Sequence, residues 1–452
     1  MQYNVKYGHP SDQKALVLGF GVSGQACVRY LHRHGYHVQV IDDCAHAQDL
    51  VTWAGFDRLE WRQSLDIAWA QAAEVVIASP GFAPHHPIVE SLVDLGIDIV
   101  SDLDGLIEAA QAPVIVVTGT NGKSTVVTQL AHVLEAQGLQ VGLGGNLGVP
   151  AYDLLQGPIP DYYVIEASSY QLARLQTPKI AWGVLLNLTP DHLAWHGSFK
   201  AYAAAKYRLF ELASNTVICD RSWPWQASWP PSRGQRRLCG CAPQSQLTWQ
   251  DDRRMIAYQG QDLITMIQFQ RPKHEFEHAM VVLTLIEALN LDVQLAARTL
   301  LRWQGMSHRC ESIGVCDQGI EWVNDSKATN VAASLKCLAH WREQMRPLIV
   351  LFGGIQKQGD DYARLFKTSQ QISRLVILYG QDAPILNQFI GKEVGLAPVI
   401  VTTTLEAAMQ LARQHGIAND VVCLSPACAS FDQFSDFSAR GDAFIAQFKE
   451  WQ

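Results

Sequence analysis

Short runs of aliphatic residues recur along the chain, and most of them end in a glycine-rich or polar loop. Because these runs are continuously apolar rather than alternating, they predict strands buried on both faces, as in a parallel sheet. Segments with helical periodicity follow several of them, and this alternation predicts the α/β class. The predicted strands are 14–18, 36–41, 74–78, 97–100, 114–117, 162–165, 183–187, 348–352, 375–379 and 420–424, with helices up to about 34, at 126–137, around 201–206 and at 280–289.

The chain of 452 residues is too long for one ordinary core, so two or three domains are expected. The first strands and helices predict a small doubly wound, Rossmann-like domain at 1–101, with a linker near 101–112. A central domain at 102–305 carries a phosphate loop on a mostly parallel sheet. A third domain at 306–452 is predicted as a second Rossmann-like α/β sheet.

The apolar run 114–117 leads directly into the loop Thr118-Gly119-Thr120-Asn121-Gly122-Lys123-Ser124-Thr125, and a helical segment follows. The glycines let the backbone approach a ligand closely, and the N–H groups at the start of a helix attract an anion. Lys123 adds a positive charge, and the Ser124 hydroxyl is a candidate ligand for Mg²⁺. The first glycine of the general eight-residue pattern would fall at Val117, so the match is incomplete. We still predict a nucleotide-phosphate site here rather than a plain strand–turn–helix.

A second glycine-rich turn, Gly19-Phe20-Gly21-Val22-Ser23-Gly24, lies between the first predicted strand and its helix. Asp42 stands roughly 20 positions further on, at the end of the next strand, as in dinucleotide-binding turns. The most direct interpretation is NAD binding, although the same geometry serves any nucleotide diphosphate. A tight turn that binds no ligand is the remaining alternative.

The predicted central domain carries three further side chains of chemical interest. Glu166 ends a strand, where a carboxylate beside a phosphate loop usually holds Mg²⁺, but where it is also placed to cap the next helix. His192 follows another strand, at the edge where open α/β sheets bind ligands, whereas a lone histidine is more often structural. Lys206 lies on a predicted helix, where a lysine is normally solvated. The glycine-rich stretch 142–148 is predicted as a turn, either near a ligand or in an ordinary loop.

Three loops of the third domain begin where predicted strands end. They are 324–330, Asn-Asp-Ser-Lys-Ala-Thr-Asn, then 353–357, Gly-Gly-Ile-Gln-Lys, and 425–434, which begins Ser-Pro-Ala-Cys-Ala-Ser. The carboxyl ends of parallel strands meet at one edge of a sheet, so we expect these loops to form one ligand-binding edge. Each loop taken alone is also compatible with simple turn chemistry.

Composition narrows the functional class further. The formal net charge of −8 argues against a general nucleic-acid binder, while small anionic substrates remain possible at local basic sites. The first residues lack the pattern of a signal peptide and no apolar run is long enough to span a bilayer, so a cytoplasmic protein is expected. The ten cysteines include no Cys-x-x-Cys pair and are interpreted as reduced and mostly structural. Residues 222–252, rich in Trp, Pro, Arg and Ser, are predicted to be an irregular excursion.

The loops at 118–125, 324–330 and 425–430 together resemble motifs of the Mur ligases of bacterial cell-wall synthesis, and the resemblance extends over nearly the whole chain. The two later motifs are similar to those of the branch that adds glutamate. The resemblance implies an N-terminal domain that holds UDP rather than NAD, a central ATPase domain, and a C-terminal domain that binds the amino acid. It further implies a monomeric, ATP-dependent ligase that joins D-glutamate to UDP-N-acetylmuramoyl-L-alanine through an acyl phosphate.

The same resemblance implies roles residue by residue. ATP would be bound by Gly119, Thr120, Asn121, Gly122, Lys123, Ser124 and Thr125 and, from the third domain, by Arg309 and Asp325. Two Mg²⁺ ions would be held by Ser124, Glu166, His192 and a carbamylated Lys206, and the catalytic group would be Lys123, Glu166, His192 and Lys206. The substrates would contact Gly21, Val22, Ser23, Asp42, Asn146, Ser168, Lys327, Thr329, Lys357, Ser430 and Phe437.

Several positions depart from the family pattern. His278 stands where an asparagine that contacts adenine is usual, Asp42-Asp43-Cys44 replaces Asp-Thr/Ser-Arg, and Gln356 occupies a position that is more often glycine. Two other enzyme hypotheses remain open, namely the same reaction with L-glutamate and an amide ligase similar to folylpolyglutamate synthases. A nucleotide-dependent regulator or a dinucleotide-binding protein without ATP turnover is the alternative outside enzymes. Because the implied ligands map onto all three domains, closure of the domains around them is also expected.

Overall fold

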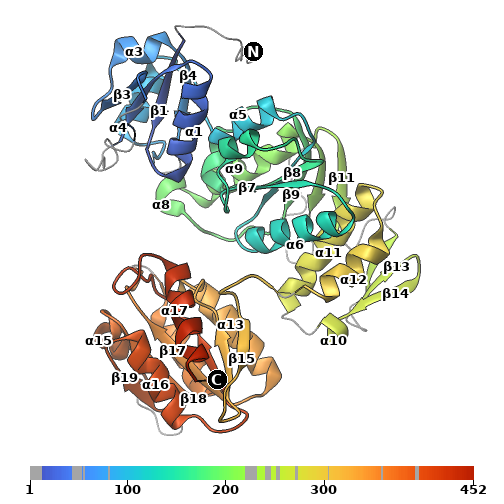
Figure 1. Ribbon diagram of the computed structural model, residues 1–452, viewed down its shortest axis with the longest axis vertical. Helices are drawn as coiled ribbons and strands as arrows, with labels where there is room; N and C mark the ends of the chain where they lie inside the picture. Colours follow the sequence, from blue (N-terminus) through green and yellow to red (C-terminus); the bar gives the residue numbers. More distant parts are fainter. Residues whose placement is uncertain are drawn as a thin grey trace. The chain divides into compact units, whose positions relative to one another are not determined.

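The structure is a computed structural model that describes residues 13–42, 53, 56–79, 82–218, 232–239, 246–250, 255–269, 273–303, 305–357, 360–391 and 396–451. Contacts within the chain define two compact units, 1–303 and 304–452. Of the four sheets found among the described residues, the first unit contains three and the second unit contains one (Figure 1). None of the helices in this part of the chain has both the length and the apolarity that a membrane crossing requires.

The first sheet is parallel throughout, with the strand order β3-β2-β1-β4-β5. Its elements are β1 (Lys14–Leu18), α1 (Val22–Arg33), β2 (His37–Ile41), β3 (Leu59–Arg62), α3 (Ile67–Ala72), β4 (Ala73–Ala78), α4 (Pro87–Asp94) and β5 (Ile99–Val100). Ala15 and Val17 face a core shared with α1, while Leu16 and Leu18 face a core shared with α3 and α4. Because helices cover both faces, the strands read as continuous apolar runs, which confirms the predicted doubly wound fold.

The second sheet is also parallel, in the order β11-β10-β9-β6-β8-β7. Its elements are β6 (Val114–Thr118), α6 (Lys123–Ala136), β7 (Val141–Gly145), the 3₁₀-helix η1 (Ala151–Gln156), β8 (Tyr162–Glu166), α7 (Ser169–Arg174), β9 (Ile180–Leu185), α8 (Leu193–His196), α9 (Phe199–Leu212), β10 (Ala213–Ile218) and β11 (Gln235–Leu238). The central strand β6 pairs Val117 with Glu166 and Thr118 with Leu185. This register brings the phosphate loop, the end of β8 and the loop after β9 to one edge of the sheet.

A small antiparallel sheet extends the core of the first unit. It consists of β12 (Leu247–Gln250), β13 (Met255–Tyr258) and β14 (Gln261–Thr265), in that order. Leu247, Ile256 and Ile264 pack into the same apolar core as α6. The helices that join this core are α10 (Met266–Phe269), α11 (Lys273–Ala288) and α12 (Val293–Leu301).

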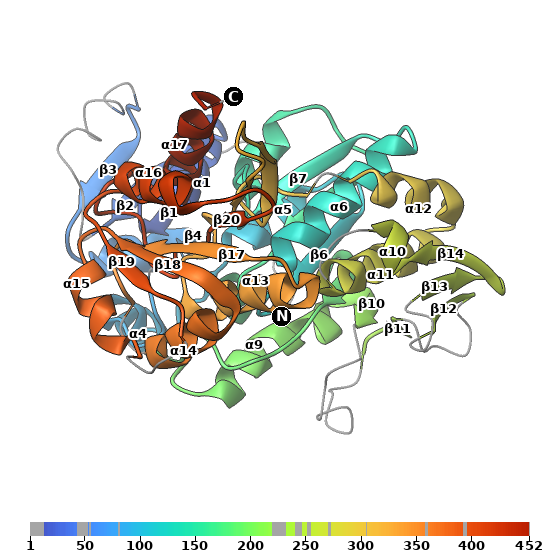
Figure 2. The same ribbon diagram turned by 90° about the horizontal axis from the view of Figure 1, so that it is seen from below.

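The second unit contains one sheet in the order β15-β16-β20-β17-β18-β19, in which only β15 runs antiparallel to its neighbour. Its elements are β15 (Glu311–Val315), β16 (Glu321–Asn324), α13 (Val331–Gln344), β17 (Leu348–Gly353), α14 (Tyr362–Ile372), β18 (Ser373–Tyr379), α15 (Ala383–Leu386), η3 (Asn387–Phe389), β19 (Val399–Val401), α16 (Leu405–His415), β20 (Val421–Leu424) and α17 (Phe437–Lys449). Helices α13 and α14 cover one face and α16 and α17 cover the other (Figure 2). In this strand order β20, the last strand in the sequence, lies between β16 and β17 in the interior of the sheet.

Four local predictions are wrong. Residues 101–112 are not a linker, because α5 (Asp102–Ala109) begins there with Ser101 and Asp104 in a reciprocal capping box. Most of 142–148, predicted as a turn, belongs to the edge strand β7. The segment 222–252, predicted to be irregular, contains β11 and β12, and its remaining parts lie largely outside the described residues. The strand predicted at 183–187 begins at Ile180 and ends at Leu185.

Candidate active site

The phosphate loop joins β6 to α6 with the backbone geometry that anion binding requires. Gly122, directly before the helix, has a φ of +87°, in the left-handed region that favours glycine. The N-cap residue of α6 is Gly122, which has no side chain that could cap the helix, as expected where the helix N-terminus itself binds an anion. The Nζ atom of Lys123 donates to the carbonyl oxygens of Gly119 and Thr120, both at 3.0 Å. The lysine thus folds back across the loop, where a phosphate would attract it.

Residues that follow β9 hold the phosphate loop in place. The Asn187 side chain accepts from the backbone N–H of Asn121 and donates to its carbonyl oxygen, both at 2.9 Å. The Thr120 hydroxyl lies 2.8 Å from the Tyr202 hydroxyl and donates to the Thr189 carbonyl oxygen at 3.1 Å. Sequence reasoning missed Asn187 and Tyr202, although a polar residue next to a strand end was a usable signal for Asn187.

Lys206 lies on α9 with only 1% of its surface exposed. Its Nζ atom donates to the Thr118 hydroxyl and to the Gly119 carbonyl oxygen, both at 3.0 Å. Burial and, to a smaller extent, the charge of Lys123 lower the pKa of Lys206 to about 7, against the opposing effects of Asp191 and Glu166. A solvated lysine is therefore excluded, and the lowered pKa favours the neutral, nucleophilic amine of Lys206 far more than in an exposed lysine.

Glu166 ends β8 and is 3% exposed. Its Oε1 atom accepts from the side-chain amide of Asn146 at 2.8 Å, while its buried Oε2 atom has no hydrogen-bond partner among the described residues. A buried carboxylate oxygen without a donor is costly unless a cation or another donor binds it. The alternative role as a helix cap is excluded, because Ser168 caps α7 by accepting from the N–H of Gln171. Glu166 therefore fits a metal-binding role.

His192 lies in the loop between β9 and α8 with a φ of +54°, which is unusual for a residue other than glycine. Its Nε2 atom is 3.6 Å from Asp191 Oδ2, and its ring centroid is 4.9 Å from that of Tyr170. The nearby His196 has its Nε2 atom 3.0 Å from the Ser169 hydroxyl. Burial lowers the pKa of His196 to about 4, and the charges of His192 and Lys206 contribute. The exposed His192 ring lies 6.4 Å, between ring centroids, from Tyr202, whose hydroxyl is hydrogen-bonded to Thr120 of the phosphate loop.

Contacts with Ser79 and Asp42 fix the conformation of the glycine-rich turn between β1 and α1. Gly19 has a φ of +92°, and a Cβ added there would lie 1.9 Å from the Ser79 hydroxyl. Asp42 accepts from the backbone N–H of Phe20 at 2.6 Å, so this predicted substrate residue holds the turn itself. The predicted contacts Gly21, Val22 and Ser23 lie at the start of α1, where the N-cap residue is Gly21, whereas Asp43 and Cys44 lie outside the described residues.

In the second unit, the pairing of β16 with β20 brings the motifs 324–330 and 425–430 together. Asp325 Oδ2 accepts from the Ser425 hydroxyl at 2.8 Å, and Oδ1 accepts from the backbone N–H of Cys310 at 3.2 Å. Burial raises the pKa of Asp325 to about 6, although its hydrogen bonds and the charge of Arg309 oppose this shift. Asp325 is thus firmly placed, and Arg309 lies near enough to influence its charge.

The residues predicted to contact glutamate gather beside these motifs. The Lys327 ammonium lies 5.3 Å from the centre of the Phe437 ring, within the range of a cation–π interaction. Ser430 is buried, and Thr329 lies half-buried in the first motif. The backbone of Lys357 donates to the Tyr362 hydroxyl, which in turn donates to the Ala427 carbonyl oxygen. The three loops therefore form one edge of the sheet, as expected from the sequence.

Arg440 is a buried residue of this edge that sequence reasoning missed. Its Nε and Nη2 atoms donate to the hydroxyl and carbonyl oxygens of Ser326 at 3.0 and 2.8 Å, and Nη1 donates to the Cys428 carbonyl oxygen at 3.1 Å. Only 1% of the residue is exposed. The guanidinium of Arg440 thus connects the motifs 324–330 and 425–430 to α17. The position of Arg440 in the sequence does not predict this role.

His278 lies on α11 against the phosphate loop. A Cβ added to Gly122 would lie 2.2 Å from the Nε2 atom of His278, so no larger residue fits at Gly122 without displacing the imidazole. The structure thereby confirms that this departure from the family pattern sits beside the loop that is predicted to bind ATP.

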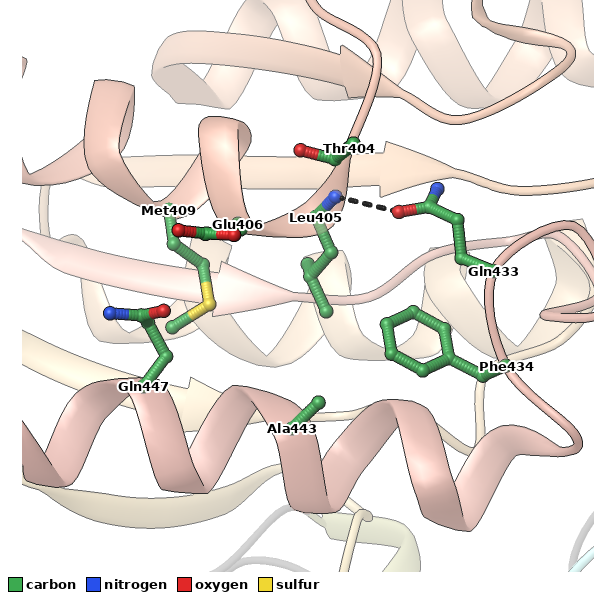
Figure 3. A pocket seen from close by; sticks show the side chains of 8 residues that line it. All are labelled: Thr404, Leu405, Glu406, Met409, Gln433, Phe434, Ala443 and Gln447. Atoms are coloured by element: carbon green, nitrogen blue, oxygen red, sulfur yellow. Dashed lines mark hydrogen bonds between the residues drawn. The ribbon is translucent and has the colours of Figure 1, made fainter.

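A cavity of about 400 Å³ in the second unit lies apart from the predicted site residues (Figure 3). Leu405, Met409 and Phe434 provide its apolar walls between α16, α17 and the loop before α17. The Gln433 side chain at its rim accepts from the backbone N–H of Leu405 at 3.0 Å. None of the predicted site residues lines this cavity.

Comparison with known proteins identifies the family. Three domain families match the chain. Residues 13–101 match the N-terminal domain of MurD-like Mur ligases, residues 117–280 match the Mur ligase middle domain, and residues 308–428 match the glutamate ligase domain of Mur ligases. The UDP-N-acetylmuramoylalanine–D-glutamate ligase of Alcanivorax borkumensis is 33% identical over 451 residues, which cover 96% of this chain and 98% of that protein. The chain belongs to the Mur ligase family.

Two further comparisons support the assignment of this chain to the Mur ligase family. The protein of the same name from Chromohalobacter salexigens is 34% identical over 444 residues, covering 95% of each chain. The solved structure of UDP-N-acetylmuramate-alanine ligase MurC from Thermotoga maritima matches with a TM-score of 0.58 at 16% identity, covering 97% of this chain and 100% of that one. That likeness confirms the predicted three-domain α/β architecture of a Mur ligase.

Proposed function

We propose that this Mur ligase joins D-glutamate to UDP-N-acetylmuramoyl-L-alanine and converts ATP to ADP and phosphate. The observation that carries the proposal is the meeting of the phosphate loop, Glu166 and Lys206 at one edge of the second sheet. The choice of substrates is supported by full-length relatives that bear the name of this activity. NAD binding is not proposed, because the N-terminal domain matches that of Mur ligases.

The chemistry requires a carboxylate to become an electrophile. The substrate carboxylate attacks the γ-phosphorus of ATP, ADP leaves, and the resulting acyl phosphate carries a good leaving group. The glutamate amine then attacks the acyl carbon, loses a proton, and phosphate departs as the amide forms. Lys123 and the N-terminus of α6 would stabilise the phosphate charge throughout.

Mg²⁺ fits the residues present, because the buried Oε2 atom of Glu166 lacks a hydrogen-bond partner among the described residues. The ion supplies charge neutralisation at the phosphates of ATP. Ser124, Glu166, His192 and Lys206 are the proposed ligands, in a site for two ions. Asn146 would orient Glu166 through its 2.8 Å hydrogen bond.

Carbamylation of Lys206 is also part of the proposal. The neutral amine would attack the carbon of CO₂ and lose one proton, which leaves a carbamate anion in place of a cation. The pKa of about 7 supports this step, because a substantial fraction of the side chain is unprotonated at neutral pH. A carbamate would also remove the like charge beside Lys123.

The remaining assignments belong to the same proposal. UDP would be bound by the turn at Gly21, Val22 and Ser23 with Asp42, ATP also by Arg309 and Asp325, and the reacting end of the UDP substrate by Asn146 and Ser168. Glutamate would be bound by Lys327, Thr329, Lys357, Ser430 and Phe437. We also propose a cytoplasmic monomer, domains at 1–101, 102–305 and 306–452, and domain closure over the ligands.

The decisive experiment measures phosphate release with each substrate omitted in turn. Release should require ATP, UDP-N-acetylmuramoyl-L-alanine and D-glutamate together, and equal release without the amino acid would contradict the ligase assignment. Chiral chromatography of the product made from racemic glutamate should find only the D isomer. Product formed from a folate substrate instead would favour the folylpolyglutamate-synthase hypothesis.

A further inference from the structure

Three cysteines from distant parts of the second unit meet around Asp325. Cys310 precedes β15, Cys337 lies on α13 and Cys423 lies in β20. The sulfur atoms of Cys337 and Cys423 are 3.4 Å apart. One donor atom from each of Cys310, Asp325 and Cys337 lies within 4.8 Å of the other two, and no other group of three His, Cys, Asp or Glu donors in the described part of the chain meets this condition.

We propose that Cys310, Asp325 and Cys337 form a binding site for a thiophilic divalent cation such as Zn²⁺. Bond lengths of about 2.3 Å to sulfur and 2.0–2.2 Å to a carboxylate oxygen place tetrahedral zinc ligands about 3.5–3.8 Å apart. Since the three donor atoms lie within 4.8 Å of one another, each pair needs to close by about 1.3 Å at most to reach that spacing. Cys423, next to Cys337, or a water molecule completes the coordination.

The donor set distinguishes this site from the proposed magnesium site. Mg²⁺ takes oxygen ligands in a near-octahedral arrangement, whereas two sulfur donors and one carboxylate suit Zn²⁺ or Cd²⁺. Buried cysteines usually act as small apolar residues, and Cys337 and Cys423 do border an apolar core, but the buried Asp325 carboxylate lies beside Cys310 and Cys337. Cys310 is only half-buried, so a cation can approach from its side.

Binding has to release protons, because thiols coordinate as thiolates. The hydrogen bond with Cys310 lowers the pKa of Cys337, but the hydrogen bond with Cys423, burial and the nearby charge of Asp325 together raise it well above its usual value. Affinity should therefore increase with pH, and proton release should accompany metal uptake.

A functional consequence follows if Asp325 contributes to ATP binding, and this consequence rests on the proposed function. A cation that occupies the Asp325 carboxylate removes it from any contact with the nucleotide. Thiophilic cations should then inhibit the ligase at concentrations that leave Mg²⁺ in large excess. The site would act as a sensor of free thiophilic metal within the C-terminal unit.

The test uses Co²⁺ as a spectroscopic stand-in for Zn²⁺, titrated into the full chain without Mg²⁺ or nucleotide. We expect thiolate-to-cobalt charge-transfer absorption in the near ultraviolet and d–d bands of a tetrahedral complex, saturating at one equivalent. Cys310→Ser and Cys337→Ser should each lose these bands. Cys316→Ser, a buried cysteine of the same unit outside the cluster, is the matched control and should keep them. Circular dichroism checks that each variant is folded.

Absence of these bands in the wild-type chain, or equal bands in folded Cys310→Ser and Cys337→Ser, would overturn the site. In the activity assay, Zn²⁺ should inhibit the wild-type and Cys316→Ser chains at least ten-fold more strongly than Cys310→Ser. Cobalt binding without this difference would overturn the inhibitory consequence while leaving the site intact. A chain without ligase activity would refute the proposed function, and the cobalt titration would still decide the site.

Discussion

The Nζ atom of Lys206 lies 3.0 Å from the carbonyl oxygen of Gly119, so helix α9 is hydrogen-bonded to the beginning of the phosphate loop. Because this amine is desolvated, its pKa falls to about 7, and its charge becomes sensitive to pH in the physiological range. The position of the loop and the protonation state of one buried lysine are therefore linked.

The free energy of unfolding should depend on the protonation of the buried Lys206. Because the pKa of Lys206 falls from 10.5 in the unfolded chain to about 7, the unfolded state binds more protons between these values. The free energy of unfolding should therefore rise with pH from about 7 to 10.5, by at most about 4–5 kcal/mol from this group. Urea unfolding in CO₂-free buffers measures this, and Lys206→Met should show a flatter pH dependence. Identical slopes for both chains would contradict the assignment.

Glu166→Gln should separate metal binding from folding. Glutamine retains an oxygen that accepts from Asn146, but it cannot neutralise a cation through the position of Oε2. We expect kcat to fall about 100-fold or more, with a higher Mg²⁺ requirement and an unfolding midpoint close to that of the wild type. Glu90→Gln, on the exposed surface of α4, is the control and should leave all three unchanged. A Glu166→Gln chain with normal kcat would exclude the metal role.

Gly122→Ala tests the contact between the phosphate loop and His278. The new Cβ meets the imidazole at 2.2 Å and also requires a φ of +87°, so we expect a loss of about 1–3 kcal/mol of stability and weaker ATP binding. Adding His278→Ala should recover the steric part of the loss but leave the backbone part. A double-mutant cycle, read by urea unfolding and ATP titration, measures both. Strictly additive effects would show that the two residues do not interact.

Arg440→Lys should weaken the edge of the C-terminal sheet. A lysine cannot reach the three oxygen atoms that the guanidinium now bonds, so one or more buried acceptors lose their donor. We expect a loss of about 1–3 kcal/mol and a larger increase in KM for glutamate than for ATP. Arg413→Lys, in an exposed ion pair with Asp317, should change stability by less than about 0.5 kcal/mol. Equal shifts of both KM values would argue against a local role.

Much of the fold could be predicted from the sequence because its site-bearing strands are buried on both faces. Strand β1 was predicted with the observed limits, and β6 differs from its prediction by one residue. The capping box at Ser101 is visible in the sequence, but the stretch 101–112 as a whole predicts a linker rather than the short helix α5. Strand β7 contains three glycines, so its composition predicts a turn, and only its pairing with β8 makes it a strand.

The chemistry at the site was less accessible, because it depends on burial that only tertiary packing creates. Lys206 was singled out by family resemblance alone, since nothing in its helix distinguishes a buried lysine from a solvated one. Cys337 and Cys423 are 86 residues apart and belong to no recognised spacing, yet their sulfur atoms are in contact. Arg440 escaped notice for the same reason.

The position of β20 between β16 and β17 has a consequence for folding during translation. Its residues pair with β16 and β17, and Ser425 reaches Asp325, which precedes it by 100 positions. A ribosome needs about 5–20 s to add that length, and during this time the two older strands have no partner between them. Such a gap in the middle of a sheet is a binding site for other strands, and it favours protection by chaperones until translation ends. A nascent chain that stalls before residue 421 would therefore be prone to misfold and would not form a truncated enzyme with partial activity.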